Sequence, residues 1–424
     1  MVKSVRFAKY DLCGVVVFAF LILMGGVFDG APLLAKDAQK STVAKDARLG
    51  GDKARTRFVA DLSRTTDYRI FTLSDPYRVI VDLPNVNFKL PQGLGTKGKG
   101  LVSAFRYGLF APGKSRIVID VIGPVHVEQS FVLKGKGETP AKLVVDIVPT
   151  DVANFKRRQR ALREKRMKER KKAGKDGISK ALKKLAKVEK NTGRLRVVID
   201  PGHGGLDPGA VASSGAREKD VVLAFSKVLA AELKRLKKYD VKLTRSVDVF
   251  VPLQERVQIA ENYNASLFIS IHADSISKRL AARTRGATIY TLSKEGSDQE
   301  ARALANKENK SNILAGLDLP EESSGVGDIL RDLTMRETKN QSLKFADYAV
   351  GRMQSKTKFT SDNTRSANFV VLRSAVVPSV LIELGYISNK QDEKLLRSKK
   401  WQASLSKALV KAIDKFMKEN VQEG

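Results

Sequence analysis

The sequence RLRVVIDPGHGG, residues 194–205, decides the fold of the C-terminal half of the chain. Its apolar run, 195–199, is short and rich in β-branched residues, and it stops at Asp200 and a Pro-Gly turn, which is typical of a buried strand. His203 follows between glycines that allow a sharp bend and the close approach of another group. Of the three histidines in the chain, His272 also ends such a strand. The pattern suggests a metal site.

Beyond this stretch, strands alternate with helical patterns to the end of the chain. This order predicts an α/β domain over 193–420, with a twisted, mostly parallel sheet and helices on both faces. One helical stripe consists of Val222, Phe225, Leu229 and Leu233, which share a face that can pack on the sheet. The expected strands are 195–200, 241–244, 267–272, 287–292, 369–373 and 379–383, and the expected helices are 219–237, 252–262, 298–313, 341–355 and 399–420.

Four chemically capable residues fall at strand ends or at a helix start: His203, Glu218, His272 and Glu383. In an open α/β sheet, ligands bind beyond the carboxyl ends of parallel strands, so these side chains are expected at one edge. Two imidazoles and one carboxylate are a common ligand set for one catalytic Zn²⁺, and a second carboxylate can transfer the proton of the attacking water. We therefore predict His203, Glu218 and His272 as ligands and Glu383 as the catalytic residue. The alternative is structural histidines and a glutamate that favours a helix N-terminus.

Six segments carry a resemblance to a known family: VIDPGHGG (198–205), REKD (217–220), LTR (243–245), SIHAD (270–274), NFVVL (368–372) and PSVLIELGYISN (378–389). They resemble the zinc-dependent N-acetylmuramoyl-L-alanine amidases of bacterial cell division. The resemblance implies hydrolysis of the amide between the lactyl group of N-acetylmuramic acid and the first L-alanine of the stem peptide, in wall remodelling and daughter-cell separation. It places the zinc ligands on His203, Glu218 and His272, and the catalytic glutamate on Glu383.

A long insertion, about 295–340, carries 10 acidic and 6 basic residues in a chain of net charge +31. In division amidases of this type, the corresponding segment resembles a regulatory helix that covers the active site, with a glutamate in the open position of the zinc. The resemblance implies autoinhibition, with Glu308 as the first candidate for the inhibitory ligand and Glu300 as the second. A partner with a LytM-type domain would then pull the helix away. An acidic surface helix without a gating role is the alternative.

The stretch 54–149 has a different pattern, with about seven short strands separated by turn residues and no helical period. This predicts a β-sandwich without a catalytic cluster, in which His126 is structural. Segments 77–83, 106–108 and 116–120 resemble the AMIN domain, which implies a cell-wall-targeting role.

The N-terminus predicts export. Basic residues precede a short apolar run and then small residues, which is the layout of a signal peptide over 1–35 and implies a periplasmic enzyme. A short polar lead, 36–53, is expected to be flexible. Between the two domains, 150–192 forms a basic linker, with 17 basic and 5 acidic residues over 151–190. It either binds an anionic envelope surface or is a solvated linker.

Three other functions are compatible with parts of the sequence. A nucleic-acid binder would explain the charge, but no nucleic-acid motif accompanies it and export opposes it. A non-catalytic peptidoglycan-binding scaffold would share the fold, although all four chemical positions are filled. A zinc peptidase that cuts within the stem peptide would use the same centre on a neighbouring bond.

Overall fold

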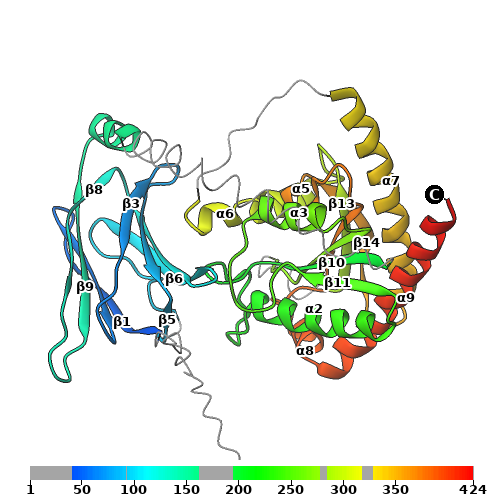
Figure 1. Cartoon of the computed structure of the whole chain (residues 1–424), viewed down its shortest axis with the longest axis horizontal. Helices are drawn as coiled ribbons and strands as arrows, with labels where there is room; N and C mark the ends of the chain where they lie inside the picture. Colours follow the sequence, from blue (N-terminus) through cyan, green and yellow to red (C-terminus); the bar gives the residue numbers. More distant parts are fainter. Residues whose placement is uncertain (1–40, 92, 162–193, 277–283, 318–327, 424) are drawn as a thin grey trace, which may run out of the picture. The chain divides into compact units, whose positions relative to one another are not determined.

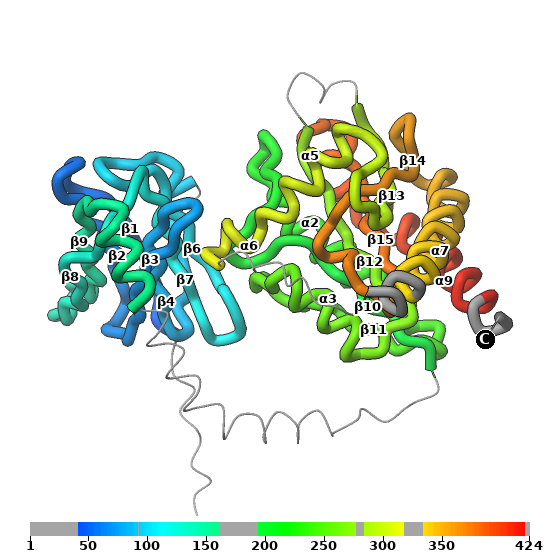
Figure 2. Tube along the Cα trace, turned by 90° about the horizontal axis from the view of Figure 1, so that it is seen from above, coloured from blue at the N-terminus to red at the C-terminus, as the bar shows by residue number. Residues whose placement is uncertain are grey.

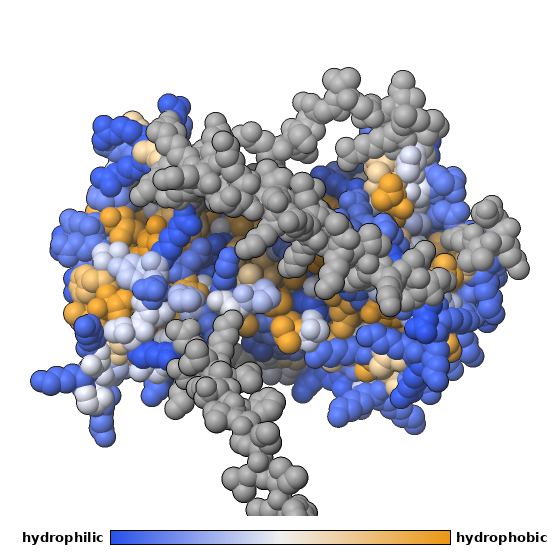
Figure 3. Space-filling model, in the orientation of Figure 1, coloured by the Kyte–Doolittle hydropathy of each residue, from blue (hydrophilic) through white to orange (hydrophobic). Residues whose placement is uncertain are grey.

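The computed structural model of the protein describes residues 41–91, 93–161, 194–276, 284–317 and 328–423 (Figure 1). The predicted signal peptide and most of the predicted basic linker lie outside these residues. Within the described part of the chain, no helix is both long and apolar enough to cross a membrane. Hydrophilic residues occupy much of the face drawn in Figure 3, as expected for a chain with a net charge of +31.

The C-terminal domain is built on a six-stranded mixed sheet in the order β11-β10-β12-β15-β13-β14. Neighbouring strands are parallel except for the antiparallel pair β13 and β15. The prediction of a mostly parallel sheet is therefore confirmed. The strands are β10 (Leu195–Pro201), β11 (Tyr239–Leu243), β12 (Leu267–His272), β13 (Ala287–Leu292), β14 (Phe359–Ala367) and β15 (Ser379–Glu383).

Helices cover both faces of this sheet, as Figure 1 shows for α3 and α5 on one side and α2 on the other. Alternation along β10 explains the two layers, because Val197 and Ile199 pack with α2, α7 and α9, whereas Val198 packs with α3 and α5. Helices α7 and α9 lie side by side in Figures 1 and 2, with the rings of Phe345 and Phe416 5.4 Å apart. The helices are α2 (Glu218–Arg235), α3 (Leu253–Asn262), α5 (Gln299–Glu308), α6 (Ser311–Leu314), α7 (Asp328–Met353), α8 (Lys390–Leu396) and α9 (Lys399–Glu423).

Two expected elements of this domain differ in the structure, and one strand of the sheet was not expected. The stretch 369–373 is not a strand but contains a short 3-10 helix, η1 (Val370–Leu372). The sixth strand is instead β14, an edge strand whose sequence FTSDNTRSA is largely polar, because one of its sides faces solvent. The expected helix 298–313 breaks into α5 and α6 at Asn309 and Lys310.

The N-terminal domain is a sandwich of a five-stranded sheet, β5-β1-β2-β9-β8, and a four-stranded sheet, β3-β4-β7-β6. Its core contains inward side chains from both sheets, among them Phe58, Val81, Ile119 and Val145. The predicted sandwich is confirmed. Its strands are β1 (Thr42–Gly51), β2 (Thr56–Leu62), β3 (Arg69–Leu73), β4 (Arg78–Pro84), β5 (Val86–Phe88), β6 (Val102–Ala111), β7 (Lys114–Val121), β8 (Val125–Leu133) and β9 (Ala141–Pro149).

Strand β1 corrects the expectation of a flexible lead over 36–53. It pairs with β2 and β5, so residues 42–51 belong to the sandwich. The alternation that would reveal it is interrupted, because the register shifts between Ala44 and Asp46. As a result, Ala44 and Ala47 both reach the core although they are three residues apart.

Candidate metal centre and active site

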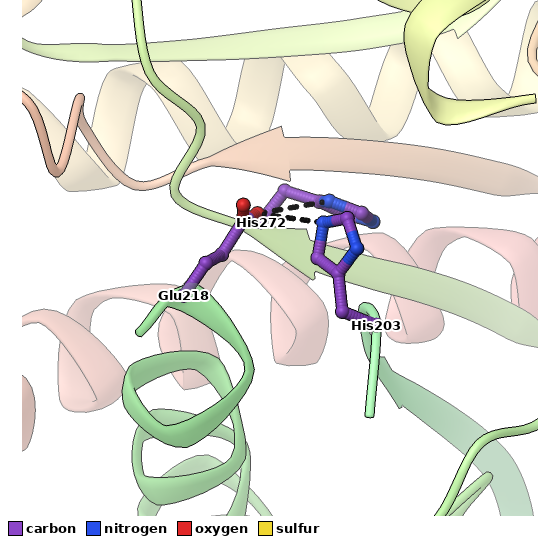
Figure 4. A group of neighbouring side chains, drawn as sticks. All are labelled: His203, Glu218 and His272. Carbon is purple, nitrogen blue, oxygen red and sulfur yellow. Dashed lines mark hydrogen bonds and ion pairs between the residues drawn. The ribbon is translucent and has the colours of Figure 1, made fainter. Parts of the chain in front are cut away.

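Three buried side chains converge at the carboxyl edge of the sheet (Figure 4). His203 lies in the loop after β10, Glu218 is the first residue of α2, and His272 is the last residue of β12. Glu218 Oε1 is 3.1 Å from His203 Nε2 and 3.2 Å from His272 Nδ1. One potential ligand atom from each residue lies within 4.8 Å of the others. The structure thus brings together the three residues that the sequence predicted as ligands.

Glycines make this convergence possible. A Cβ atom on Gly202 would lie 2.4 Å from the His272 ring, and one on Gly209 would lie 2.6 Å from Glu218 Oε2. His203 itself has a φ of 58°, a left-handed conformation that is uncommon for a residue with a side chain. The loop therefore holds a strained backbone conformation at His203, and this conformation directs the imidazole toward Glu218 and His272.

Asp207 fixes the orientation of His203, and sequence reasoning did not identify it. His203 Nδ1 lies 2.9 Å from Asp207 Oδ2, and both groups are buried. Burial alone would raise the pKa of Asp207, but the charge and hydrogen bond of His203, with further hydrogen bonds, lower that pKa to about 2. An ionised Asp207 accepts a hydrogen bond from the Nδ1–H group, which leaves the Nε2 lone pair directed at Glu218 and His272.

The residues present fit a metal ion. His203 Nε2 is buried and has no hydrogen-bond partner among the described residues. Burial raises the pKa of the Glu218 carboxyl, but the charges of the two imidazoles beside it lower that pKa to well below its usual value. Glu218 also accepts backbone hydrogen bonds from Ala210 and Ala273, which hold the carboxylate in place. Two nitrogen donors and one ionised oxygen donor match the ligand set of a catalytic zinc.

Glu383 lies beside this cluster at the end of β15, where it is the register partner of His272 on β12. Its Oε2 accepts a hydrogen bond from the backbone amide of Asp274 at 2.9 Å, and its Oε1 has no hydrogen-bond partner in the described part of the chain. Burial, with the nearby charges of Glu218 and Asp274, raises the pKa of Glu383 well above its usual value. A carboxylate whose pKa is raised in this way accepts a proton more readily than an ordinary glutamate, as a catalytic base requires.

Glu308, the last residue of α5, occupies the remaining side of the cluster. Its Oε2 is 3.3 Å from His203 Nε2 and 3.5 Å from His272 Nδ1, and the side chain is 7% exposed. Two neighbours hold it there, because Lys307 forms an ion pair with Asp274 and Ser311 Oγ donates a hydrogen bond to Asp207. We call residues 299–317, which contain α5 and α6, the gate segment.

Glu300, the second candidate for the inhibitory ligand, lies elsewhere. It belongs to the first turn of α5, forms an ion pair with Arg365 at 2.9 Å, and its side chain is 71% exposed. The structure therefore does not bring Glu300 to the cluster.

A buried ion pair supports the loop that carries His203. Asp200 Oδ1 is 2.7 Å from Arg256 Nη1, and Arg256 Nη2 donates to the His203 carbonyl at 2.8 Å. We expect Asp200→Ala to lower the free energy of unfolding by about 3–5 kcal/mol, because Arg256 would keep a buried, unpaired charge. Urea unfolding followed by circular dichroism measures the loss. Asp46→Ala, which breaks an exposed pair with Arg48, is the control and should cost about 0–1 kcal/mol. Equally small losses of unfolding free energy in the two variants would contradict the stabilising role of the Asp200–Arg256 pair.

Comparison with known proteins assigns both domains to known families. Residues 197–415 match the N-acetylmuramoyl-L-alanine amidase family, and residues 46–159 match the AMIN domain family. The chain is 38% identical over 228 residues to N-acetylmuramoyl-L-alanine amidase AmiA of Escherichia coli (strain K12), covering 54% of this chain and 78% of that protein. It is 29% identical over 380 residues to N-acetylmuramoyl-L-alanine amidase AmiC of Neisseria meningitidis serogroup B, covering 88% and 90%.

Among solved structures, N-acetylmuramoyl-L-alanine amidase AmiC2 of Nostoc punctiforme is 28% identical, with a TM-score of 0.37, and the match covers 53% of this chain and 97% of that one. The family assignment rests on the sequence matches, which span both domains described above. The chain therefore belongs to the N-acetylmuramoyl-L-alanine amidases, enzymes of peptidoglycan hydrolysis, and carries an AMIN domain ahead of its catalytic domain.

Proposed function

We propose that the protein is a zinc-dependent amidase of daughter-cell separation that its own gate segment holds inactive until a partner releases it. One observation carries the proposal: His203, Glu218 and His272 converge on one point, and the carboxylate of Glu308 faces both imidazoles from the remaining side. The bond cleaved would be the amide between the lactyl group of N-acetylmuramic acid and L-alanine.

The residues of the site have distinct tasks in this reaction. Zinc held by His203, Glu218 and His272 would supply Lewis acidity and lower the pKa of a water molecule. Glu383 would accept the proton of the attacking water and deliver it to the departing amine of L-alanine. The products would then be a lactyl carboxylate on the glycan and a free peptide amine, which accounts for the atoms of the water.

Asp207 is expected to raise the affinity of the site for zinc. Asp207→Asn keeps the shape of the side chain but removes the charge that favours the Nδ1-protonated form of His203. Loss of such a carboxylate partner weakens metal binding by about 10–100-fold, which titration against a chelator of known affinity measures. Asp220→Asn changes an exposed carboxylate paired with Arg217, so it should leave the affinity unchanged. Equal affinities for the two variants would rule out the orienting role of Asp207.

The buried environment of Glu308 supports its gating role. Burial raises the pKa of Glu308, and the nearby carboxylates of Glu218 and Asp274 add to this, while the imidazoles lower it. The carboxylate is thus placed where a cation would stabilise it, and without such a gain its burial would be unfavourable. A LytM-type partner that binds the gate segment in its open state would shift the equilibrium toward the active form.

We also propose that the enzyme is exported to the periplasm and binds the cell wall there. The periplasm is the compartment that the residues 1–35 predict, and peptidoglycan is the polymer that the enzyme hydrolyses. The AMIN domain would target the enzyme to the wall, and the basic residues of 150–192 would meet an anionic envelope surface.

Mass spectrometry of the fragments released from purified peptidoglycan tests the bond that is cut. The proposal expects stem peptides that begin with a free L-alanine amine, together with glycan strands whose lactyl groups end in carboxylates. Fragments that retain L-alanine on the muramic acid would instead identify a peptidase that cuts within the stem. Release of neither product, with zinc bound and the gate opened by Glu308→Ala, would favour a non-catalytic wall-binding scaffold.

A further inference from the structure

One sheet of the AMIN domain contacts the end of the gate segment. We propose that the sheet β3-β4-β7-β6 is the docking surface for residues 313–316, so that the AMIN domain itself helps to keep the amidase closed. The inference rests on the proposed gating role of Glu308, but it concerns a different surface and different residues.

Three arginines of this sheet bind the carbonyl end of α6. Arg78 Nη1 donates to the Ile313 carbonyl at 2.5 Å, and Arg106 Nε donates to the Leu314 carbonyl at 2.5 Å. Arg116 Nη1 donates to the carbonyls of Ala315 and Gly316, both at 3.1 Å. The last carbonyls of a helix lack intrahelical partners and carry partial negative charge, so cationic donors are the groups that suit them.

Two of these arginines are held in position by their own sheet. Arg116 binds Asp82 through Nε and Nη2, at 2.6 and 2.9 Å, and Arg106 makes a two-point pair with Asp120. The Arg116 guanidinium also lies 3.6 Å from the ring centroid of Phe110. A guanidinium fixed in this way loses little conformational entropy when it binds a further acceptor. The sheet therefore presents a preorganised set of donors.

Apolar packing makes the contact specific. Ala315 is fully buried in a cluster that includes Phe71, Ile80 and Val118 of the same sheet. Gly316 follows with a φ of 69°, and a Cβ atom at this position would lie 2.5 Å from Ile80 Cδ1. A glycine is thus needed both for the backbone conformation and for the close approach to the sheet.

A short connection links this contact to the metal centre. Glu308 precedes Ala315 by seven residues, and Ser311 and Asn312 bind the catalytic domain between them. Ser311 Oγ donates to Asp207, and Asn312 Oδ1 accepts from the Leu253 amide at 3.0 Å. The contacts of the sheet with residues 313–316 and the approach of Glu308 to the imidazoles occur together in this structure, so we expect the sheet contacts to favour the closed state.

The three arginines belong to the segments that resemble the AMIN domain. Arg78, Arg106 and Arg116 fall within segments 77–83, 106–108 and 116–120. In this chain Arg78 and Arg116 are 1% and 4% exposed, and both bind the gate segment.

The test compares two variants that break the contact from opposite sides. Arg116→Gln removes the charge from the sheet, and Gly316→Val places a branched side chain against Ile80 without altering the sandwich. In the full-length, zinc-loaded protein without an activator, each should raise dye release from labelled peptidoglycan about tenfold, the effect of losing one charge-assisted hydrogen bond. Each should also speed hydrogen exchange of the amides in α5 and α6. Arg57→Gln, which changes a pair with Asp146 in the other sheet, should alter neither readout.

The outcomes separate this inference from the gating role of Glu308. If Glu308→Ala raises dye release but Arg116→Gln and Gly316→Val change neither dye release nor exchange, the docking surface is refuted and gating stands. If both variants speed exchange in the gate segment while Glu308→Ala leaves dye release unchanged, docking stands and gating by Glu308 is refuted. Should Arg116→Gln unfold the sandwich, Gly316→Val alone decides.

Discussion

Replacing Glu383 with glutamine should reduce amide hydrolysis by about 10²–10⁴-fold while the protein keeps its metal. Glutamine has the shape of glutamate but cannot accept the proton of the attacking water. The carboxylate it replaces is buried next to His272, with Oε1 free of hydrogen-bond partners among the described residues. The rate is best measured as dye release in a Glu308→Ala background, where the gate does not limit access, with zinc per chain measured by mass spectrometry.

The structure offers a control for this experiment. Glu393→Gln changes a carboxylate in α8 that pairs with Arg397 and touches none of the three ligands, so its rate should equal that of the parent. Near-normal turnover of Glu383→Gln at full zinc content would refute the proton-transfer role. Loss of zinc together with activity would instead show that Glu383 helps to hold the metal.

Replacing Glu308 with alanine should raise basal hydrolysis about tenfold or more without an activator, because it removes the carboxylate that faces both imidazoles opposite the ligand Glu218. In the zinc-loaded protein the metal would stabilise this buried carboxylate in the closed state only, so its removal also takes away a favourable contact of that state. Dye release from labelled peptidoglycan, measured at equal zinc content, gives the ratio of basal rates.

Glu300→Ala is the matched control, since it removes a carboxylate from the same helix. Glu300 is exposed and pairs with Arg365, so the basal rate should stay that of the wild type. The gating role fails if Glu308→Ala leaves the basal rate unchanged with zinc bound. An equal rise in both variants would point to a general loosening of α5 rather than to a blocked metal.

Much of the site could be predicted because its chemistry follows directly from strand ends. His272 and Glu383 each end a short, continuous apolar run, and parallel strands place such ends at one edge. The sequence did not indicate a role for Asp207 in the site, because an aspartate in a glycine-rich loop is typical of an ordinary turn. Its role depends on the position of the His203 ring, which the sequence does not show.

The missed elements share a physical cause. Strands β1 and β14 have a weak hydrophobic period, since a register shift interrupts the first and polar edge residues dominate the second. Their strand conformation comes from pairing with neighbours distant in sequence. The docking of the gate segment on the sandwich could not be predicted from the sequence either, because Arg78 and Ile313 are 235 residues apart in the chain.

The most direct test of the account is a crystal structure of the zinc-loaded full-length protein, with anomalous difference maps measured on both sides of the zinc absorption edge. The account predicts one strong peak within about 2.0–2.2 Å of His203 Nε2, His272 Nδ1 and a Glu218 oxygen, with a Glu308 oxygen as the fourth ligand. A peak bound to other residues would contradict the metal centre. A peak at the three ligands with Glu308 turned away and water in the fourth position would contradict autoinhibition.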